Sequence, residues 1–213
     1  MKNTNKKANK RSPISKGAKF IFVGLGNPGE VYKKTRHNVG FLTLEHFRKQ
    51  FNFPDWIESA KTVALISKDT LGKHTVTLAL PQTFMNKSGS SVKKLVTSKK
   101  AAEDLVVVYD DLDLPLGTLK ISFGRSSGGH NGVESIIKSI GTKDFVRLRV
   151  GVSPATPKGK VKKPKGEQKI LDFLMKDFRK PEQEQLKKIF KQTDKALGLL
   201  VTEGRAKAMN EVN

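Results

Sequence analysis

The chain has 213 residues, no cysteine and a formal net charge of +21, with 41 Lys and Arg against 20 Asp and Glu. The absence of cysteine excludes disulfides, thiolate catalysis and cysteine-ligated metal sites, and no apolar run approaches the roughly 18–20 residues of a membrane span. The length fits one domain with a sizeable core. The basic balance favours a polyanionic partner, because Lys and Arg that contact phosphates release condensed counterions.

Two segments concentrate the positive charge. Residues 1–19 carry seven Lys or Arg and no acidic residue, and residues 155–169 carry six Lys and one Glu. We expect residues 1–18 to be a disordered basic arm and residues 19–213 to be the folded domain. The prolines and glycines of 155–169 indicate a flexible basic loop. The N-terminus lacks the apolar core of a secretory signal, so we expect a cytoplasmic protein.

The folded part begins with a short apolar run, residues 20–23, which predicts a strand buried within a sheet. A glycine-rich turn follows, and then a polar stretch that holds His37 between Arg36 and Asn38. Such polar groups beyond the carboxyl end of a strand lie where open α/β sheets place their sites. Apolar residues at helical spacing then predict a helix over residues 39–50.

The next segments predict a hairpin and a second helix. Residues 62–67 and 74–80 flank a short polar turn, as in an antiparallel hairpin. Residues 81–86 are predicted to be a loop, and Ser88 marks the start of a helix with an apolar stripe. A second fully apolar run, residues 105–109, predicts another buried strand that ends at Asp110.

The C-terminal half predicts two more strands and two helices. A strand over 118–123 leads into a glycine-rich loop and a helix that Gly141 caps. Residues 145–152 alternate, with Arg147 and Arg149 on the face opposite the valines. A last helix begins at Pro181 and ends at Gly204. Strands interleaved with helices predict an α/β fold with a mixed sheet.

The turn GLGNPG at residues 24–29 matches the dinucleotide-binding pattern after a strand, with Glu45 about twenty residues further on. In that class of protein the last glycine opens a helix and the acidic residue ends a second strand. Here residues 30–34 have no apolar stripe, and Glu45 lies within a predicted helix. The residues around the glycine turn therefore argue against a dinucleotide site, although a nicotinamide-dependent enzyme stays an alternative.

Five motifs in one order carry a resemblance to a known family. They are GLGNPG followed by Tyr32, TRHNVG, PQTFMNKSG, DDLDLPLG and SGGHNG. Together they resemble the bacterial-type peptidyl-tRNA hydrolases, from about Lys19 to Arg205. The resemblance implies a single α/β domain whose twisted mixed sheet is sandwiched by helices, and a monomer that acts on tRNA with no cofactor and no metal.

The family reaction is hydrolysis of the ester that joins a peptide, or an N-blocked amino acid, to tRNA, which recycles tRNA from stalled or dropped-off translation. The resemblance implies that His37 is the general base that deprotonates water, a task suited to an imidazole with a pKa near neutrality. It implies that Asp110 holds the useful tautomer of His37 and stabilises its protonated form. A structural role is the competing interpretation of both residues.

The remaining site residues also come from the resemblance. Asn27 is expected to accept from the peptide N–H, and the substrate or tRNA is expected to contact a further set: Tyr32, Phe84, Asn86, Asn131, Arg125 and Arg149. Arg147 is a further candidate for a phosphate contact, because guanidinium binds phosphate in a bidentate way. His130 is predicted to be structural. Ser122 stands where family members often have a basic residue that clamps the tRNA end, and Arg125 is a candidate replacement.

Two further interpretations stay open, a non-catalytic RNA-binding protein and a magnesium site. A non-catalytic RNA-binding protein of the same fold, like the hydrolase-like plant splicing factors, would use the same basic surface, but the chain retains His37, Asp110 and all three asparagines. The carboxylates of Asp110, Asp111 and Asp113 could suggest a magnesium site, but these residues belong to the motif DDLDLPLG, which matches the family.

Overall fold

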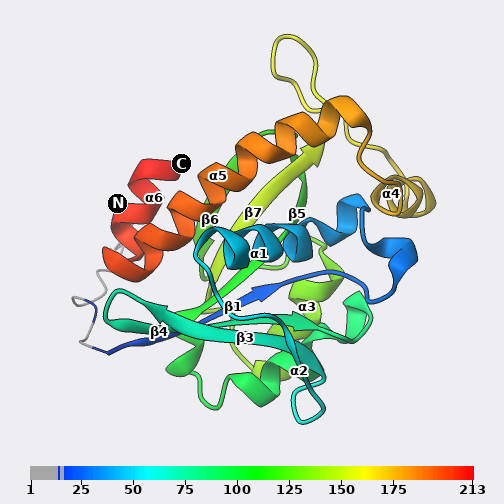
Figure 1. Cartoon of the computed structure of the whole chain (residues 1–213). Helices are drawn as coiled ribbons and strands as arrows, with labels where there is room; N and C mark the ends of the chain where they lie inside the picture. Colours follow the sequence, from blue (N-terminus) through cyan, green and yellow to red (C-terminus); the bar gives the residue numbers. More distant parts are fainter. Residues whose placement is uncertain (1–13, 15–16) are drawn as a thin grey trace, which may run out of the picture.

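One seven-stranded sheet organises the chain, in the strand order β2-β3-β4-β1-β5-β7-β6 (Figure 1). The computed structural model describes residue 14 and residues 17–213, so the predicted arm at 1–18 lies almost wholly outside the described residues. At the centre, β1 (Lys19–Gly24) runs parallel to β4 (His74–Pro81) and to β5 (Leu105–Pro115). β1 and β5 are largely buried on both faces, which explains their continuous apolar runs.

The outer strands make the sheet mixed, as the sequence predicts. β7 (Val146–Ser153) pairs parallel to β5, and β6 (Leu119–Phe123) pairs antiparallel to β7. On the other side, β3 (Ala64–Leu71) forms the predicted hairpin with β4, and β2 (Ile57–Ser59) adds an unpredicted edge strand.

Helices cover both faces of the sheet (Figure 1). α1 (Val39–Gln50) and α5 (Lys180–Thr202) lie on one face, and α2 (Ser88–Leu95) and α3 (Asn131–Ile140) lie on the other. The sandwiched α/β architecture is therefore confirmed. The other helices of the described residues are α4 (Glu167–Leu174), α6 (Arg205–Val212) and four short 3₁₀ helices: η1 (Glu30–Tyr32), η2 (Arg36–Asn38), η3 (Met85–Lys87) and η4 (Ala101–Asp104).

Two apolar layers hold these helices to the sheet. Phe22 of β1 belongs to the layer under α1 and α5, where its ring packs edge-on against Phe47 at 5.7 Å. The next residue, Val23, points to the other layer, with Val92 of α2 and Ile136 of α3. Alternation along one strand thus feeds both cores.

The start of α1 lies directly on the carboxyl end of β1 and on the neighbouring Val108 of β5. A Cβ atom added to Gly40 would come within 2.4 Å of the Val108 carbonyl oxygen and 2.5 Å of the Leu25 amide nitrogen. Only glycine permits this close approach. The approach brings η2, which carries His37, to the part of β5 just beyond the end of β1, where Asp110 lies.

The predicted end of β5 at Asp110 is wrong. The strand continues to Pro115, because Asp110 and Asp111 still pair with Val150 and Gly151 of β7. The charged run therefore lies in the sheet and not in a loop.

The segment 155–169 is also more regular than predicted. Ala155 bridges Val161, and the Lys162 amide donates to the Pro154 carbonyl at 2.8 Å, so residues 154–162 form a small hairpin above the sheet (Figure 1). The last three residues belong to α4, which begins at Glu167 after Gly166, where the prediction had no helix. The prediction of a loop over residues 85–86 likewise fails, because they begin η3.

Within the described residues, no helix combines the length and the apolar content that a bilayer span requires.

Candidate active site

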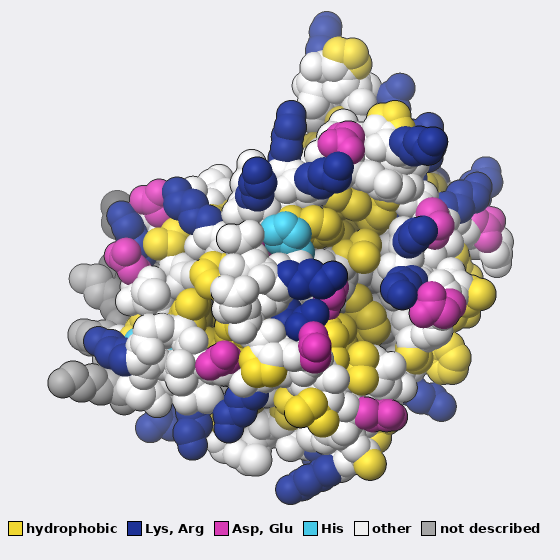
Figure 2. Space-filling view, in the orientation of Figure 1, with side chains coloured by type: hydrophobic (Ala, Val, Ile, Leu, Met, Phe, Trp, Pro, Cys, Tyr) yellow, Lys and Arg dark blue, Asp and Glu magenta, His cyan; other side chains and the backbone are white. Residues whose placement is uncertain are grey.

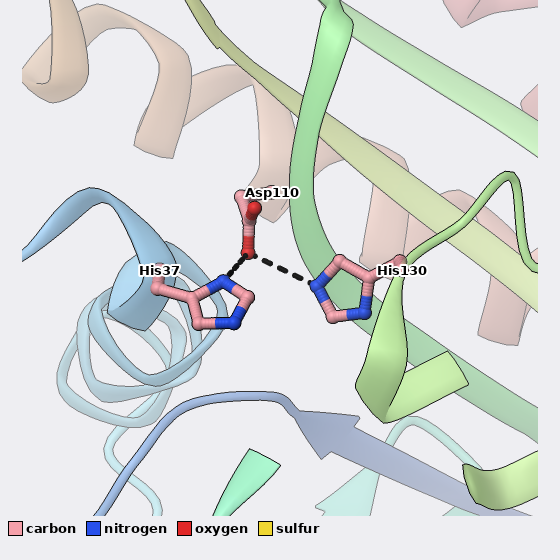
Figure 3. Close-up of side chains that lie close together, drawn as sticks. All are labelled: His37, Asp110 and His130. Atoms are coloured by element: carbon pink, nitrogen blue, oxygen red, sulfur yellow. Dashed lines mark hydrogen bonds and ion pairs between the residues drawn. The ribbon is translucent and has the colours of Figure 1, made fainter. Parts of the chain in front are cut away.

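His37 and Asp110 meet just beyond the carboxyl end of β1. His37 lies in η2 and Asp110 in β5, and the two side chains are almost fully buried. The Nδ1 atom of His37 lies 2.8 Å from Oδ1 of Asp110 (Figure 3). A carboxylate only accepts, so Nδ1 carries the proton and Nε2 keeps its lone pair. His37 also lines a cleft, so the basic nitrogen belongs to a side chain that substrate can approach.

The electrostatics of the pair favour the protonated form of His37. Burial opposes the charged form of His37, but the charge and hydrogen bond of Asp110 outweigh burial and raise the pKa of His37 above 6.5. Burial likewise opposes the charged form of Asp110, but the two neighbouring imidazoles lower its pKa, so the carboxyl stays ionised.

His130 is the second partner of Asp110, a contact that the sequence analysis missed. Its Nε2 lies 3.1 Å from Oδ1 of Asp110, and its Nδ1 accepts from the Val133 amide at 3.3 Å, which caps α3. The amide contact assigns the proton to Nε2, so His130 donates to Asp110. The predicted structural role is therefore incomplete. The only sequence signal was a histidine next to Asn131, just before an amphipathic helix.

The three side chains also have the spacing of a metal site, since one nitrogen or oxygen of each lies within 4.8 Å of the others. In this arrangement, however, Nδ1 of His37 and Nε2 of His130 both direct their protons at Asp110. A metal ligand needs the lone pair instead. The donor set is that of a hydrogen-bonded network, and the absence of a metal stays a prediction.

Asn27 connects the His37 segment to η3, the short helix that contains Asn86. The main chain of Asn27 makes two hydrogen bonds of 2.9 Å with the side chain of Asn38, the residue after His37. Its side-chain Oδ1 accepts from the Met85 amide at 2.8 Å, next to Asn86 in η3. An amide oxygen has two lone pairs, so Oδ1 retains one acceptor position.

A cleft of about 1300 Å³ opens beside the His37–Asp110 pair. Its lining includes three of the predicted binding residues, Asn131, Arg125 and Arg149. Arg125 is exposed in the glycine-rich loop, and Arg149 of β7 is half-buried, with Nε donating to Asp111. This cleft therefore brings together catalytic and cationic candidates that lie up to 112 positions apart in the sequence, from His37 to Arg149.

Arg147, the further candidate for a phosphate contact, lines the cleft but is bound by the protein itself. Its side chain is fully buried, and its guanidinium donates to the carbonyls of Lys143, Phe145 and Arg125 while it stacks 4.1 Å from the Phe145 ring. Arg147 therefore fixes the glycine-rich loop to β7 and is not free to clamp a phosphate.

The other predicted binding residues lie outside the lining of this cleft. Tyr32 is half-buried in η1, Phe84 is 57% exposed before η3, and Asn86 is exposed within η3. Asn27 does not line the cleft either, although its two partners border His37 and Asn86.

Ser122, the departure from the family pattern, is buried on β6 opposite Arg147. A cation two residues away, Lys120, lies directly opposite Arg149 across the same pair of strands, and both line the cleft. With Lys163, the cleft lining includes four exposed or half-buried cations: Lys120, Arg125, Arg149 and Lys163.

The glycine-rich turn does not have the geometry of a dinucleotide site. Gly29 adopts φ 109° and leads into the single 3₁₀ turn of η1, not into an α-helix. The three-residue turn offers no row of helix N-terminal amides to a pyrophosphate.

Comparison with known proteins identifies the family. The family model described as peptidyl-tRNA hydrolase matches residues 21–213. The peptidyl-tRNA hydrolase of Herpetosiphon aurantiacus is 41% identical over 196 residues, which cover 91% of this chain and 90% of that protein. The enzyme of the same name from Aquifex aeolicus is 40% identical over 178 residues, 83% of this chain and 87% of its own length.

Solved structures agree with this assignment. The crystal structure of peptidyl-tRNA hydrolase from Acinetobacter baumannii superposes with a TM-score of 0.81 at 28% identity, covering 95% of this chain and 97% of that one. A second crystal structure, of a peptidyl-tRNA hydrolase in complex with N-propanol, gives a TM-score of 0.80 at 30% identity, covering 91% of this chain and 94% of that one. The chain described here belongs to the peptidyl-tRNA hydrolase family of enzymes.

Proposed function

We propose that this enzyme hydrolyses the ester between tRNA and a peptide or N-blocked amino acid, with His37 as general base and water as nucleophile. The observation that supports it most is the 2.8 Å contact of His37 Nδ1 with Asp110, because it leaves Nε2 of a cleft residue as the proton acceptor. Nε2 takes a proton from water as the water oxygen attacks the acyl carbon. The proton then goes to the departing ribose oxygen.

Asp110 and His130 support this step electrostatically. The imidazolium that forms at His37 lies against an ionised carboxylate, which stabilises it. The N–H of His130 donates to the same oxygen and keeps Asp110 charged and oriented. His130 is in our proposal a positioning residue that acts through Asp110.

The asparagines and aromatic residues are proposed to hold the substrate. Asn27 offers its second lone pair to the peptide N–H, a group that a free ammonium replaces poorly. The exposed amides of Asn86 and Asn131 are free to orient water or the ester. Tyr32 and Phe84 offer rings against which the terminal adenosine or the peptide could pack.

The direct test is cleavage of one tRNA charged in two ways, with an N-acetylated and with a free amino acid. We expect the purified full-length chain to release the N-acetylated amino acid and to spare the free one, in the presence or absence of EDTA. Equal cleavage of both substrates would contradict the role of Asn27, and loss of activity in EDTA would contradict a metal-independent reaction. Failure to cleave either substrate would contradict the proposed function.

The hairpin at 154–162 and the three residues after it, together called the basic hairpin, are proposed to add affinity for the tRNA backbone. Lys158, Lys160, Lys162 and Lys165 are exposed, while Lys163 donates to Asp113 and lines the cleft. Lys and Arg side chains gather around the protrusion at the top of the molecule (Figure 2). Backbone hydrogen bonds give this segment a defined shape. The Thr156 amide, for example, donates to the Lys160 carbonyl at 2.9 Å. The basic arm at residues 1–18 is proposed to act in the same way.

Replacing these four lysines with glutamine is therefore expected to raise KM and to flatten its salt dependence. Each lost phosphate contact lowers the slope of log affinity against log salt by about 0.7–0.9. A matched control replaces four exposed lysines near the end of α2, Lys93, Lys94, Lys99 and Lys100, which do not line the cleft. Both variants lose the same charge. Identical KM values and salt slopes for the two variants would contradict a contact at the hairpin.

We further propose that the enzyme works in the cytoplasm as a monomer, as expected for a translation-linked hydrolase. Sedimentation of the purified chain at micromolar concentration tests the oligomeric state.

A further inference from the structure

Both chain neighbours of His37 are buried polar residues that the proposed reaction does not use. Arg36 is 4% exposed and Asn38 is 1% exposed. Asn38 clamps the main chain of Asn27 with two hydrogen bonds of 2.9 Å. Arg36 makes a different set of contacts, which reach a part of the chain about 140 positions away.

The guanidinium of Arg36 is held by two backbone carbonyls, one carboxylate and two aromatic rings. Nη1 donates to the carbonyls of Lys176 and Asp177 at 3.0 Å each, and Nη2 donates to Oε2 of Glu182 at 2.7 Å. The rings of Phe173 and Phe178 lie 4.5 and 5.4 Å from its central carbon, within the range of cation–π attraction.

The backbone reinforces this connection. The Arg36 amide donates to the Lys176 carbonyl at 3.1 Å, and the Phe178 amide donates to the Lys34 carbonyl at 3.3 Å. Thr35 and Asp177 thereby form an isolated antiparallel bridge. The segment that carries His37 is thus joined to the linker between α4 and α5, residues 175–179.

That linker continues directly from a wall of the cleft. Ile170, Leu171 and Leu174 of α4 line the cleft, and Phe173 of the same helix covers Arg36. Arg36 therefore touches the elements on both sides of the linker: α4, and the first turn of α5 through Glu182.

Glu182 is held in its charged form. Burial favours its protonated form, but hydrogen bonds from the Arg179 amide and from the Arg36 and Arg179 side chains lower its pKa. Its Oε2 accepts both from the Arg179 amide at 2.6 Å and from Arg36, so the cap of α5 and the ion pair share one oxygen.

We propose that the buried Arg36–Glu182 pair is a positioning element for catalysis, which holds the His37 imidazole against Asp110 and fixes α4 relative to it. This inference rests on the proposed role of His37 as general base. A buried ion pair contributes little net stability, because desolvation offsets most of its attraction, so stability alone gives a weak reason for this pair. Geometry gives a stronger reason, since a displacement of about 1 Å at a reacting group costs roughly 100-fold in rate.

The chain offers a matched control in Arg48. Arg48 is also buried, at 8% exposed, donates to the carbonyls of Phe53 and Pro54 at 3.3 Å and to Asp55 at 2.7 Å, and stacks 5.9 Å from Trp56. It lies at the far end of α1 and does not line the cleft. Arg36→Lys and Arg48→Lys therefore remove the same guanidinium fork from two similar enclosures.

The experiment measures kcat, KM and the titration of the His37 ring by NMR in the full-length variants. For Arg36→Lys we expect kcat to fall by about 10- to 100-fold with a smaller change in KM. We expect the pKa of His37 to move down toward 6.5, because a looser contact weakens the attraction of Asp110. Asp110 of β5 and His130 before α3 are the titratable groups that face the ring, and both are unchanged in this variant. Arg48→Lys is expected to leave kcat and the His37 titration at their wild-type values.

Glu182→Gln gives a second, near-isosteric test if Arg36→Lys does not fold. It keeps the shape of the side chain and removes the charge that Arg36 faces, so the same loss of kcat and the same downward shift of the His37 pKa are expected. An unchanged His37 titration in a folded Arg36→Lys or Glu182→Gln variant would overturn the inference, as would equal losses of activity in Arg36→Lys and Arg48→Lys. If the wild type cleaves no peptidyl-tRNA, the proposed function fails, whereas the substrate-free titration still decides the positioning role.

Discussion

Replacing His37 with alanine is expected to lower kcat on N-acetyl-aminoacyl-tRNA by about 10²–10⁴-fold, the usual contribution of a general base. The variant loses Nε2 of His37, the ring nitrogen that the contact with Asp110 leaves free to accept a proton. The variant keeps the predicted binding residues Arg125 and Arg149 and the basic hairpin, so KM and direct tRNA binding are expected to change little.

The control for this loss is His46→Ala. His46 of α1 lies 3.0 Å from a carboxylate oxygen of Asp194, so it is also one half of a histidine–carboxylate pair, but it does not line the cleft. We expect His46→Ala to retain wild-type kcat under conditions where it is folded. A His37→Ala enzyme with near-normal kcat would remove the general base from the mechanism.

Replacing Asp110 with asparagine is expected to cost less than the loss of His37, about 10- to 100-fold in kcat. This range corresponds to the roughly 1.5–3 kcal/mol that a hydrogen bond to a charged group contributes. The amide removes the charge that stabilises the His37 imidazolium and can present an N–H where the carboxylate only accepts. Asp110→Asn therefore impairs the tautomer and the protonated form of His37 but leaves the proton acceptor in place.

Asp194→Asn supplies the matched control, because it neutralises the carboxylate of the other histidine pair. Stopped assays at saturating substrate compare the four variants. A larger loss in Asp110→Asn than in His37→Ala would mean that Asp110 has a direct part in the chemistry, against the orienting role assigned here.

Sequence patterning predicts the central strands and the helices that cover them because local periodicity determines them. Residues 20–23 and 105–109 are buried on both faces and have continuous apolar runs, and α1 was predicted with its observed bounds. The continuation of β5 through Asp110 and Asp111 was not predictable in this way. Those carboxylates stay in the strand because β7 pairs with them and because His37, His130 and Arg149 accommodate their charge.

The site shows the same division between local and distant causes. The five motifs named His37 and Asp110, and the structure brings them into contact. The burial of Arg147 depends on carbonyls of a loop 22 positions away, and the clamp on Arg36 depends on Glu182, 146 positions away. No pattern along the chain predicts such long-range contacts, because they form only when the sheet and the α4–α5 linker are assembled.

The pH dependence of kcat/KM in the wild type and in Asp110→Asn tests the His37–Asp110 pair most directly. The base must be neutral to accept a proton, so kcat/KM is expected to rise with pH through the His37 pKa and then level off. Because Asp110 raises that pKa above 6.5, the wild-type midpoint should lie above this value, and in Asp110→Asn it should move to lower pH. A rate that is flat across the histidine range, or a midpoint that Asp110→Asn leaves unmoved, would contradict the pairing of these two residues as the source of catalysis.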